Sequence, residues 1–136
     1  MRDSKSNLKF MSVIPPAVVS DDTAKVGAII DRQGFESLTY MIATGTLADA
    51  DATFTVLLEE GNQSDLSDAS AVADGDLIGT EADASFNFGD DDVVRSLGYI
   101  GSKRYTRLTI TPSGNGAAAP VSAAAVLSGA HSLPVA

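Results

Sequence analysis

The feature of this sequence that most constrains its fold is a two-residue alternation of apolar and polar side chains in short runs. In the run from Glu36 to Thr44, Leu38, Tyr40 and Ile42 occupy every second position and small polar residues stand between them. Successive side chains of a β-strand point to opposite faces, so this period predicts a half-buried strand. A helix would need a period of 3.6 residues, which is weak almost everywhere in the chain.

About eight runs of this kind follow one another, bounded by clusters of Gly, Pro, Asp and Ser. They cover residues 8–14 with a short continuation at 17–20, then 25–31, 36–44, 52–60, 84–88, 97–100, 103–111 and 121–129. No strands alternate with long helices, so we predict an all-β fold, an antiparallel β-sandwich or jelly roll of about eight short strands. The expected core contains Leu38, Tyr40, Ile42, Phe54, Val56, Leu58, Phe86, Phe88, Leu108 and Ile110.

Two connections carry specific expectations. Gly101 and Ser102 separate two of the runs, and a two-residue loop with Gly first predicts a type II′ hairpin there. The link 45–51 suits a hairpin or a connection at the edge of a sandwich. A short helical turn is expected between Gly61 and Gly79, where Ser and Asp precede a run of small residues.

The first sixteen residues are expected to form an N-terminal arm or edge strand, followed by a single sandwich domain at 17–136. Pro15 and Pro16 lack backbone N–H groups, so the ladder of the run 8–14 should end there. Because residues 1–7 are polar and the prolines interrupt pairing, we expect this segment to pack against a partner chain rather than its own sheet, with Leu8 and Phe10 as contact residues.

Composition excludes several classes of function. The chain has no cysteine, which removes thiolate catalysis, disulfides and Cys-ligated metals. Its single histidine, His131, lies in a tail where nothing local would orient the ring, so we predict a protein that is not an enzyme and has no cofactor. A net charge of −9 has the wrong sign for binding free nucleic acid, and no apolar stretch is long enough to span a membrane.

The charges are segregated along the chain. Between Gln33 and Val94 there are fourteen Asp and Glu residues and no Lys or Arg. One interpretation is solubility and turn chemistry, because Asp is a common loop residue. The other is a surface whose acidic and basic parts meet different partners. Pairs such as Asp49 with Asp51 and Asp74 with Asp76 could supply oxygen ligands for calcium, but none has the spacing of a known calcium loop, so no metal site is predicted.

The most site-like group is a basic and aromatic cluster. It comprises Arg95, Lys103, Arg104, Tyr105 and Arg107. In one interpretation these arginines pair with acidic residues of neighbouring strands. In the other they bind the carboxylates of a partner, either another protein or a neighbouring copy's acidic segment between Gln33 and Val94.

Four segments also resemble a known family. They are 12–19 (SVIPPAVV), 31–38 (DRQGFESL), 54–61 (FTVLLEEG) and 98–108 (GYIGSKRYTRL). Together they look like small proteins of tailed-phage and prophage head modules, which resemble capsid cement or decoration proteins. The resemblance spans nearly the whole chain, and its motifs are not catalytic signatures.

What this resemblance implies is a protein on the exterior of the virion, made in the host bacterial cytoplasm. It would bind the outer surface of the shell, clamp neighbouring major capsid protein subunits and form a homo-oligomer there. The alternatives are a carbohydrate-binding jelly-roll module and another head-completion or tail structural protein.

Overall fold

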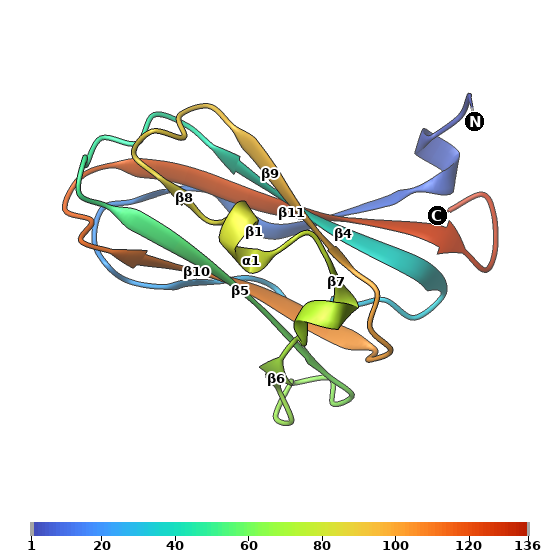
Figure 1. Cartoon of the computed structure of the whole chain (residues 1–136). Coiled ribbons are helices and arrows are strands. Elements are labelled where there is room, and N and C mark those ends of the chain that lie inside the picture. Colours follow the sequence, from blue (N-terminus) through green and yellow to red (C-terminus); the bar gives the residue numbers. More distant parts are fainter. Residues whose placement is uncertain (1, 136) are drawn as a thin grey trace.

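The structure is a computed structural model that describes residues 2–135, and it shows two antiparallel sheets packed as a sandwich (Figure 1). Within residues 2–135 there are six longer strands: β1 (Lys9–Val19), β4 (Phe35–Thr44), β5 (Thr53–Gly61), β9 (Val94–Tyr99), β10 (Tyr105–Ser113) and β11 (Ala119–Ala130). Five two-residue strands complete the sheets: β2 (Lys25–Val26), β3 (Ile30–Asp31), β6 (Ser70–Ala71), β7 (Leu77–Ile78) and β8 (Phe86–Asn87). The helical segments are η1 (Lys5–Asn7), η2 (Asp74–Asp76) and α1 (Glu81–Ala84).

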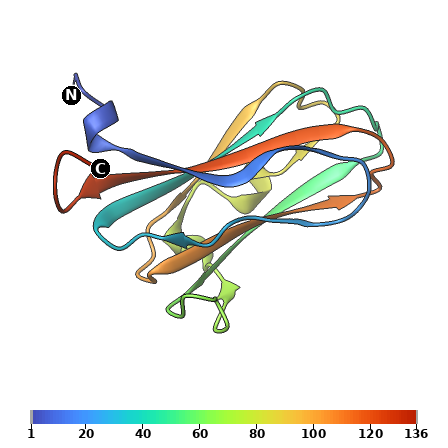
Figure 2. The same ribbon diagram turned by 180° about the vertical axis from the view of Figure 1, so that it is seen from behind.

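The two sheets have different strand orders. Sheet A runs β1-β11-β4-β9-β7, and sheet B runs β2-β10-β5-β6, with β3 also on β10 and β8 on β5. Seen from behind, β1 and β11 cross the whole length of the molecule side by side (Figure 2). Every pairing is antiparallel, so the predicted all-β antiparallel sandwich is confirmed.

The core lies between the sheets and follows the predicted alternation. Nine of the ten expected core residues are buried, among them Tyr40, Leu58 and Leu108 at 0% exposure. The prediction is wrong for Phe88, which is 44% exposed. Its strand, β8, ends at Asn87, so the alternation that buries Phe86 does not continue to residue 88.

The prediction that the N-terminal strand ends at Pro15 is wrong. β1 continues to Val19, and its pairing with β11 has register shifts between Ser12 and Ile14 and between Ile14 and Ala17. Those irregularities leave both prolines unpaired, so their missing N–H groups break no ladder bond. β1 lies at an edge of sheet A, where residues 9–19 pair with β11 of their own sheet. Contact of this segment with a partner chain stays a prediction.

The predicted hairpin at Gly101 and Ser102 is also wrong. β9 belongs to sheet A and β10 to sheet B, so residues 100–104 cross from one sheet to the other. The backbone N–H of Lys103 donates to the Tyr99 hydroxyl at 3.0 Å, which shapes the crossing. The link 45–51 connects β4 in sheet A to β5 in sheet B. Of the two predicted possibilities, it is the connection at a sandwich edge and not a hairpin.

The short helical turn predicted between Gly61 and Gly79 is the 3₁₀ turn η2, and a second turn was not predicted. Residues 70–71 form β6, residues 74–76 form η2, and the α-helical turn α1 follows at 81–84. Its N-cap is Thr80, whose hydroxyl accepts a hydrogen bond from the Asp83 N–H at 3.0 Å. The capping signal of Thr80 was missed because the following segment is too short to show helical periodicity.

The segment around α1 covers an edge of sheet B. The Leu58 N–H donates to Glu81 Oε2 at 2.7 Å, and the Val56 N–H donates to Ser85 Oγ at 3.0 Å. The Leu58 carbonyl accepts from the Val72 N–H at 3.0 Å. These contacts satisfy the open side of β5, which would otherwise offer a template for strand pairing.

Candidate interaction surfaces

The structure divides the predicted basic cluster between the two ends of the sandwich. Arg95 lies near the start of β9 and donates to Asp90 at 2.6 Å. Lys103 and Arg104 lie beyond the other end of β9, in the crossing 100–104. Arg95 and Tyr99 lie four strand residues apart, about 13 Å, and Arg104 lies beyond Tyr99, so Arg95 does not share one compact site with Arg104.

At that second end, Arg104 forms the best-defined ion pair. Its Nε and Nη2 atoms donate to the two carboxylate oxygens of Asp31 at 2.9 and 2.8 Å, and its guanidinium lies 4.9 Å from the ring centre of Tyr105. The hydrogen bonds from Arg104 hold the pKa of Asp31 below its ordinary value. The pair is exposed, at 44% and 41%, so it orders the end of the sheet more than it stabilises the fold.

Arg107 pairs across sheet B. It lies opposite Glu59 in the register of β10 and β5, and its Nη2 donates to Glu59 Oε1 at 3.0 Å. The interpretation that these arginines pair with nearby acidic residues is therefore confirmed for Arg95, Arg104 and Arg107. Among the ion pairs within residues 2–135, Lys103 takes no part, although its charge helps to lower the pKa of Asp68.

A residue that sequence reasoning missed, Arg32, holds the crossing in place. Its Nη2 donates to the Gly101 carbonyl at 2.8 Å, its Nε donates to the Lys103 carbonyl, and its guanidinium lies 5.2 Å from the centre of the Tyr99 ring. The Tyr99 hydroxyl donates to Glu60, and burial together with that bond raises the pKa of Tyr99 to about 12. Nothing in the sequence around Arg32 marks this role, because its partners lie about seventy residues away.

Charge separates along the molecule's length. We call one end the basic end because it gathers six of the nine basic residues: Arg2, Lys5, Lys9, Arg32, Lys103 and Arg104. Asp3, Asp31, Glu36, Glu60 and the loop with Asp65 and Asp68 lie beside them, so this end carries both signs of charge. We call the other the acidic end, which carries Asp21, Asp22, Asp49, Asp51, Asp90, Asp91 and Asp92. The Asn115 N–H donates to Asp22 and the Gly116 N–H donates to Asp49, which ties these acidic loops together.

Several aspartates of the chain stabilise turns, as expected of loop residues. The Asp21 carboxylate accepts from the Thr23 N–H at 2.9 Å, and Asp65 accepts from the Ser67 N–H at 3.0 Å. Such hydrogen bonds favour the charged carboxylate and lower the pKa of both groups. Within residues 2–135, no three or more His, Cys, Asp or Glu side chains are grouped so that they could hold a metal ion. His131 bonds to Glu36 at an exposed position.

Asp49 makes the acid stability of this end testable. Hydrogen bonds from the Gly116 and Asp51 N–H groups hold its pKa below the ordinary value of 3.8. A lowered folded-state pKa contributes stability that is complete above the unfolded-state pKa and is lost as pH falls through the folded-state pKa. We expect the melting temperature to drop below about pH 4 and to drop less in Asp49→Asn, which does not titrate there. The single amide oxygen of Asn can accept only one of the two bonds, so this variant is also expected to be less stable than wild type at pH 7.

Thermal unfolding followed by circular dichroism between pH 2 and pH 7 measures this. Asp74→Asn is the matched control, because no residue within 2–135 donates a hydrogen bond to the Asp74 carboxylate. An Asp49→Asn curve that parallels the wild-type curve throughout the acid range would contradict the assignment.

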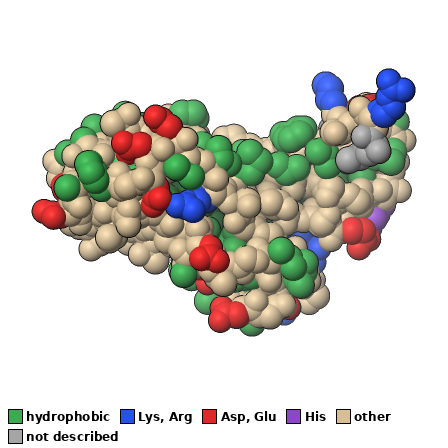
Figure 3. Space-filling view, turned by 45° about the horizontal axis from the view of Figure 1, so that its top comes forward, with side chains coloured by type: hydrophobic (Ala, Val, Ile, Leu, Met, Phe, Trp, Pro, Cys, Tyr) green, Lys and Arg blue, Asp and Glu red, His purple; other side chains and the backbone are tan. Residues whose placement is uncertain are grey.

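The largest surface feature was not found from the sequence. The outward side chains of sheet A, which we call the neutral face, include no charged group. They are Phe10, Ser12, Pro16 and Val18 of β1, Ser37, Thr39, Met41 and Ala43 of β4, Ile78 of β7, Val94, Ser96 and Gly98 of β9, and Pro120, Ser122, Ala124, Val126 and Ser128 of β11. Figure 3 looks onto this side and shows hydrophobic and neutral side chains between blue groups at the N-terminal end and red groups at the other.

Several apolar side chains on the neutral face are open to solvent. Phe10, Val18, Val94 and Ile78 are each about 60% exposed. In a chain with 27 charged residues, a sheet face that carries none of them is unusual, and contiguous exposed apolar surface is typical of protein interaction sites. Of the predicted contact residues, Phe10 lies on this face, and Leu8 precedes β1 at its basic end.

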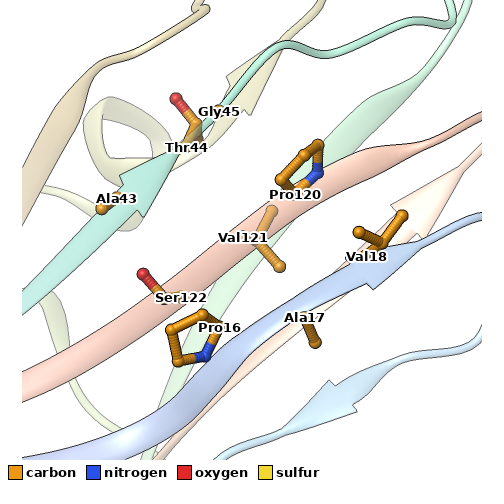
Figure 4. A pocket seen from close by; sticks show the side chains of 9 residues that line it. All are labelled: Pro16, Ala17, Val18, Ala43, Thr44, Gly45, Pro120, Val121 and Ser122. Carbon is orange, nitrogen blue, oxygen red and sulfur yellow. The ribbon is translucent and has the colours of Figure 1, made fainter.

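The neutral face is hollowed at its centre. Two adjoining hollows of about 380 and 230 Å³ share Pro16, Ala43 and Ser122 as lining residues. Figure 4 shows the larger one bordered by Pro16 and Val18 from β1 and by Pro120 from β11. Its floor is shallow because Ala and Ser side chains stand between larger neighbours. Such a hollow suits an apolar side chain of a partner better than a small polar ligand.

Comparisons with known proteins show the fold. No protein-family model matches the chain, and no curated protein sequence matches it. Among solved structures, the PBSX exported protein XepA matches with a TM-score of 0.56 at 14% identity over 100% of this chain and 41% of that one. The chain thus spans about two fifths of the length of XepA.

Two further structures come from phages or prophages. The SPBc2 prophage-derived protein YomS has a TM-score of 0.47 at 11% identity, covering 90% of this chain and 94% of that one. A chain of the cyanophage Pam1 capsid asymmetric unit has a TM-score of 0.47 at 14% identity, covering 94% and 89%. The comparison with XepA shows that the sandwich fold is shared with that protein.

In the described part of the chain there is no helix long and apolar enough to cross a membrane.

Proposed function

We propose that this protein is a phage capsid cement, or decoration, protein that binds the outer surface of the shell and clamps neighbouring major capsid protein subunits. The observation that carries the proposal is the division of its surface into a neutral face, an acidic end and an end that gathers most of the basic residues. A protein that bridges subunits needs more than one contact surface on a rigid body, and each copy bound to the shell stabilises it by mass action.

The resemblance of four sequence segments to phage head-module proteins supports the same function, and XepA, whose name places it with the prophage PBSX, supplies the fold. The protein would lie on the exterior of the virion after synthesis in the host bacterial cytoplasm. Its acidic surface would keep decorated particles soluble and apart from free nucleic acid.

A carbohydrate-binding module is the weaker candidate. Such modules stack sugars on exposed aromatic rings, but Tyr40 and Tyr99 are buried here and the Arg104 guanidinium lies over Tyr105. These rings are therefore not free platforms, and a protein partner fits the described surfaces better.

We propose the basic end as one contact with the shell. Lys103 and Arg104 project from the crossing 100–104, which Arg32 and Tyr99 hold rigid. Arg104 has only one carboxylate partner, Asp31, in an exposed pair, so a capsid carboxylate can exchange for it or join it at little cost.

Replacing both residues, Lys103→Ala with Arg104→Ala, is expected to lower capsid occupancy about tenfold or more, because desolvated charge pairs at an interface are costly to break. Sedimentation of the variant with expanded capsids, followed by quantitation of bound protein, measures the effect. Arg95→Ala with Lys25→Ala removes the same charge elsewhere and is the matched control. Equal loss in both double variants would show that only net charge matters, and no loss in the first would exclude this contact.

A further inference from the structure

The neutral face approaches the size of a standard interface, and no segment within residues 2–135 packs over it. We propose that it is the contact between two copies of this chain, packed face to face and antiparallel about a two-fold axis that passes over Ala124. This inference goes beyond the proposed function and concerns the protein before it meets any shell.

The size of the face agrees with this occupant. Its four long strands, about 4.8 Å apart and about ten residues long, cover roughly 600 Å², and η1 and the end loops add to it. A standard protein interface buries about 800 Å² on each partner. Its small central residues, Ala43, Ser122 and Ala124, allow the two sheets a close approach.

The face is complementary to itself. Phe10 lies opposite Val126 in the register of β1 and β11, and Ser12 lies opposite Ala124. The hollows centre on Ser122. Ser122 and Val126 lie two residues from Ala124 on β11, on opposite sides of it. A two-fold axis over Ala124 therefore places each Phe10 ring over the hollow of the other copy, which is the mutual contact that an isologous interface requires.

Charge fixes the direction of packing. Lys5 lies in η1, beyond the end of β1 at Lys9, and Asp49 lies at the opposite end, where the Ala48 N–H donates to the Ala118 carbonyl at 3.1 Å. Antiparallel packing brings the Arg2 and Lys5 side of each copy over the acidic end of the other. Parallel packing would superimpose like charges in a chain with a net charge of −9.

The first experiment measures the oligomeric state of the full chain alone, by sedimentation equilibrium over a range of concentrations. Wild type is expected to form dimers, and Ser122→Arg, which places an unpaired charge in the hollow, is expected to raise the dissociation constant roughly 100-fold or more. Thr111→Arg adds the same charge to the exposed face of sheet B and is expected to leave the dimer intact. A monomeric wild type, or equal weakening by both variants, overturns the proposal.

The second experiment tests the direction of packing. The chain has no native cysteine, so single cysteines can be introduced cleanly and joined by a short bismaleimide. Ala124→Cys lies at the proposed axis and is expected to cross-link to its own counterpart. Ser37 pairs with Ser128, which lies four strand residues, about 13 Å, from the axis. The cysteines of two Ser37→Cys copies would therefore lie about 26 Å apart, and this variant is expected not to cross-link. Efficient cross-linking at both positions overturns the antiparallel arrangement.

Neither readout depends on a capsid. Ser122→Arg tested against expanded capsids then separates the two proposals, since loss of the dimer in solution is measured independently of shell binding. A trimer or higher ring in sedimentation would overturn the two-fold arrangement while leaving the cement function to be judged by capsid occupancy alone.

Discussion

Replacing Phe54 with alanine is expected to lower the free energy of unfolding by about 3–5 kcal/mol, because a fully buried ring leaves a cavity that close-packed neighbours fill only in part. Phe54 is 1% exposed, and its ring stacks on Phe86 with centroids 4.8 Å apart and planes 11° apart. The contact joins β5 to β8, a two-residue strand at the edge of sheet B, so the loss should also loosen the segment that follows α1.

Urea unfolding followed by circular dichroism measures this free energy. Phe88→Ala is the matched control. Phe88 lies two residues after Phe86, and it is 44% exposed. Its effect is expected to stay within about 0.5 kcal/mol. If the two variants lost the same stability, the ring of Phe54 would not be the packing element that the structure indicates.

Gly27→Ala is expected to destabilise the fold by roughly 1–3 kcal/mol through overpacking. A Cβ atom at residue 27 would lie 2.6 Å from the Leu108 carbonyl oxygen and 2.6 Å from Val13 Cγ1. The Gly27 N–H donates to that same Leu108 carbonyl at 2.7 Å, and the Ala28 N–H donates to the Val13 carbonyl at 2.9 Å. The chain here joins β10 of sheet B to β1 of sheet A, and a side chain would push the two sheets apart.

Thermal unfolding of Gly27→Ala beside Gly75→Ala checks this prediction. A Cβ at residue 75 would meet no heavy atom within 4 Å, so that substitution changes only backbone entropy. A melting temperature for Gly27→Ala as high as that of Gly75→Ala would show that the two sheets can separate at this edge without cost.

The candidate surfaces were only partly predictable. Arg104 and Arg107 stood out in the sequence because basic residues are few and these two flank Tyr105. Their partners, Asp31 and Glu59, lie 73 and 48 residues away, and which carboxylate each arginine meets depends on the strand order of sheet B. Arg95 shared their sequence neighbourhood but lies at the other end of β9, because an extended strand separates residues that a turn would bring together.

The neutral face shows the same limit on a larger scale. Each strand of sheet A has an outward set of small or apolar residues, such as Thr39 and Met41 in β4 or Ser122 and Ala124 in β11. Taken singly, such a set is ordinary in a half-buried strand. It becomes an interaction surface only because β1, β11, β4, β9 and β7 lie side by side in that order.

The sequence by itself determined the longer strands and the inward face of several of them, and hence nine residues of the core, because side-chain alternation is a local property of the extended chain. It also determined the excess of acidic residues and the lack of thiol chemistry. Only the tertiary structure decided that β1 passes through two prolines, that residues 100–104 cross between sheets, and that uncharged strand faces adjoin. Those outcomes depend on hydrogen bonds and packing between residues that are distant in sequence. The backbone groups of a strand and the residues of a turn are compatible with more than one pairing, and the long-range contacts select one of them.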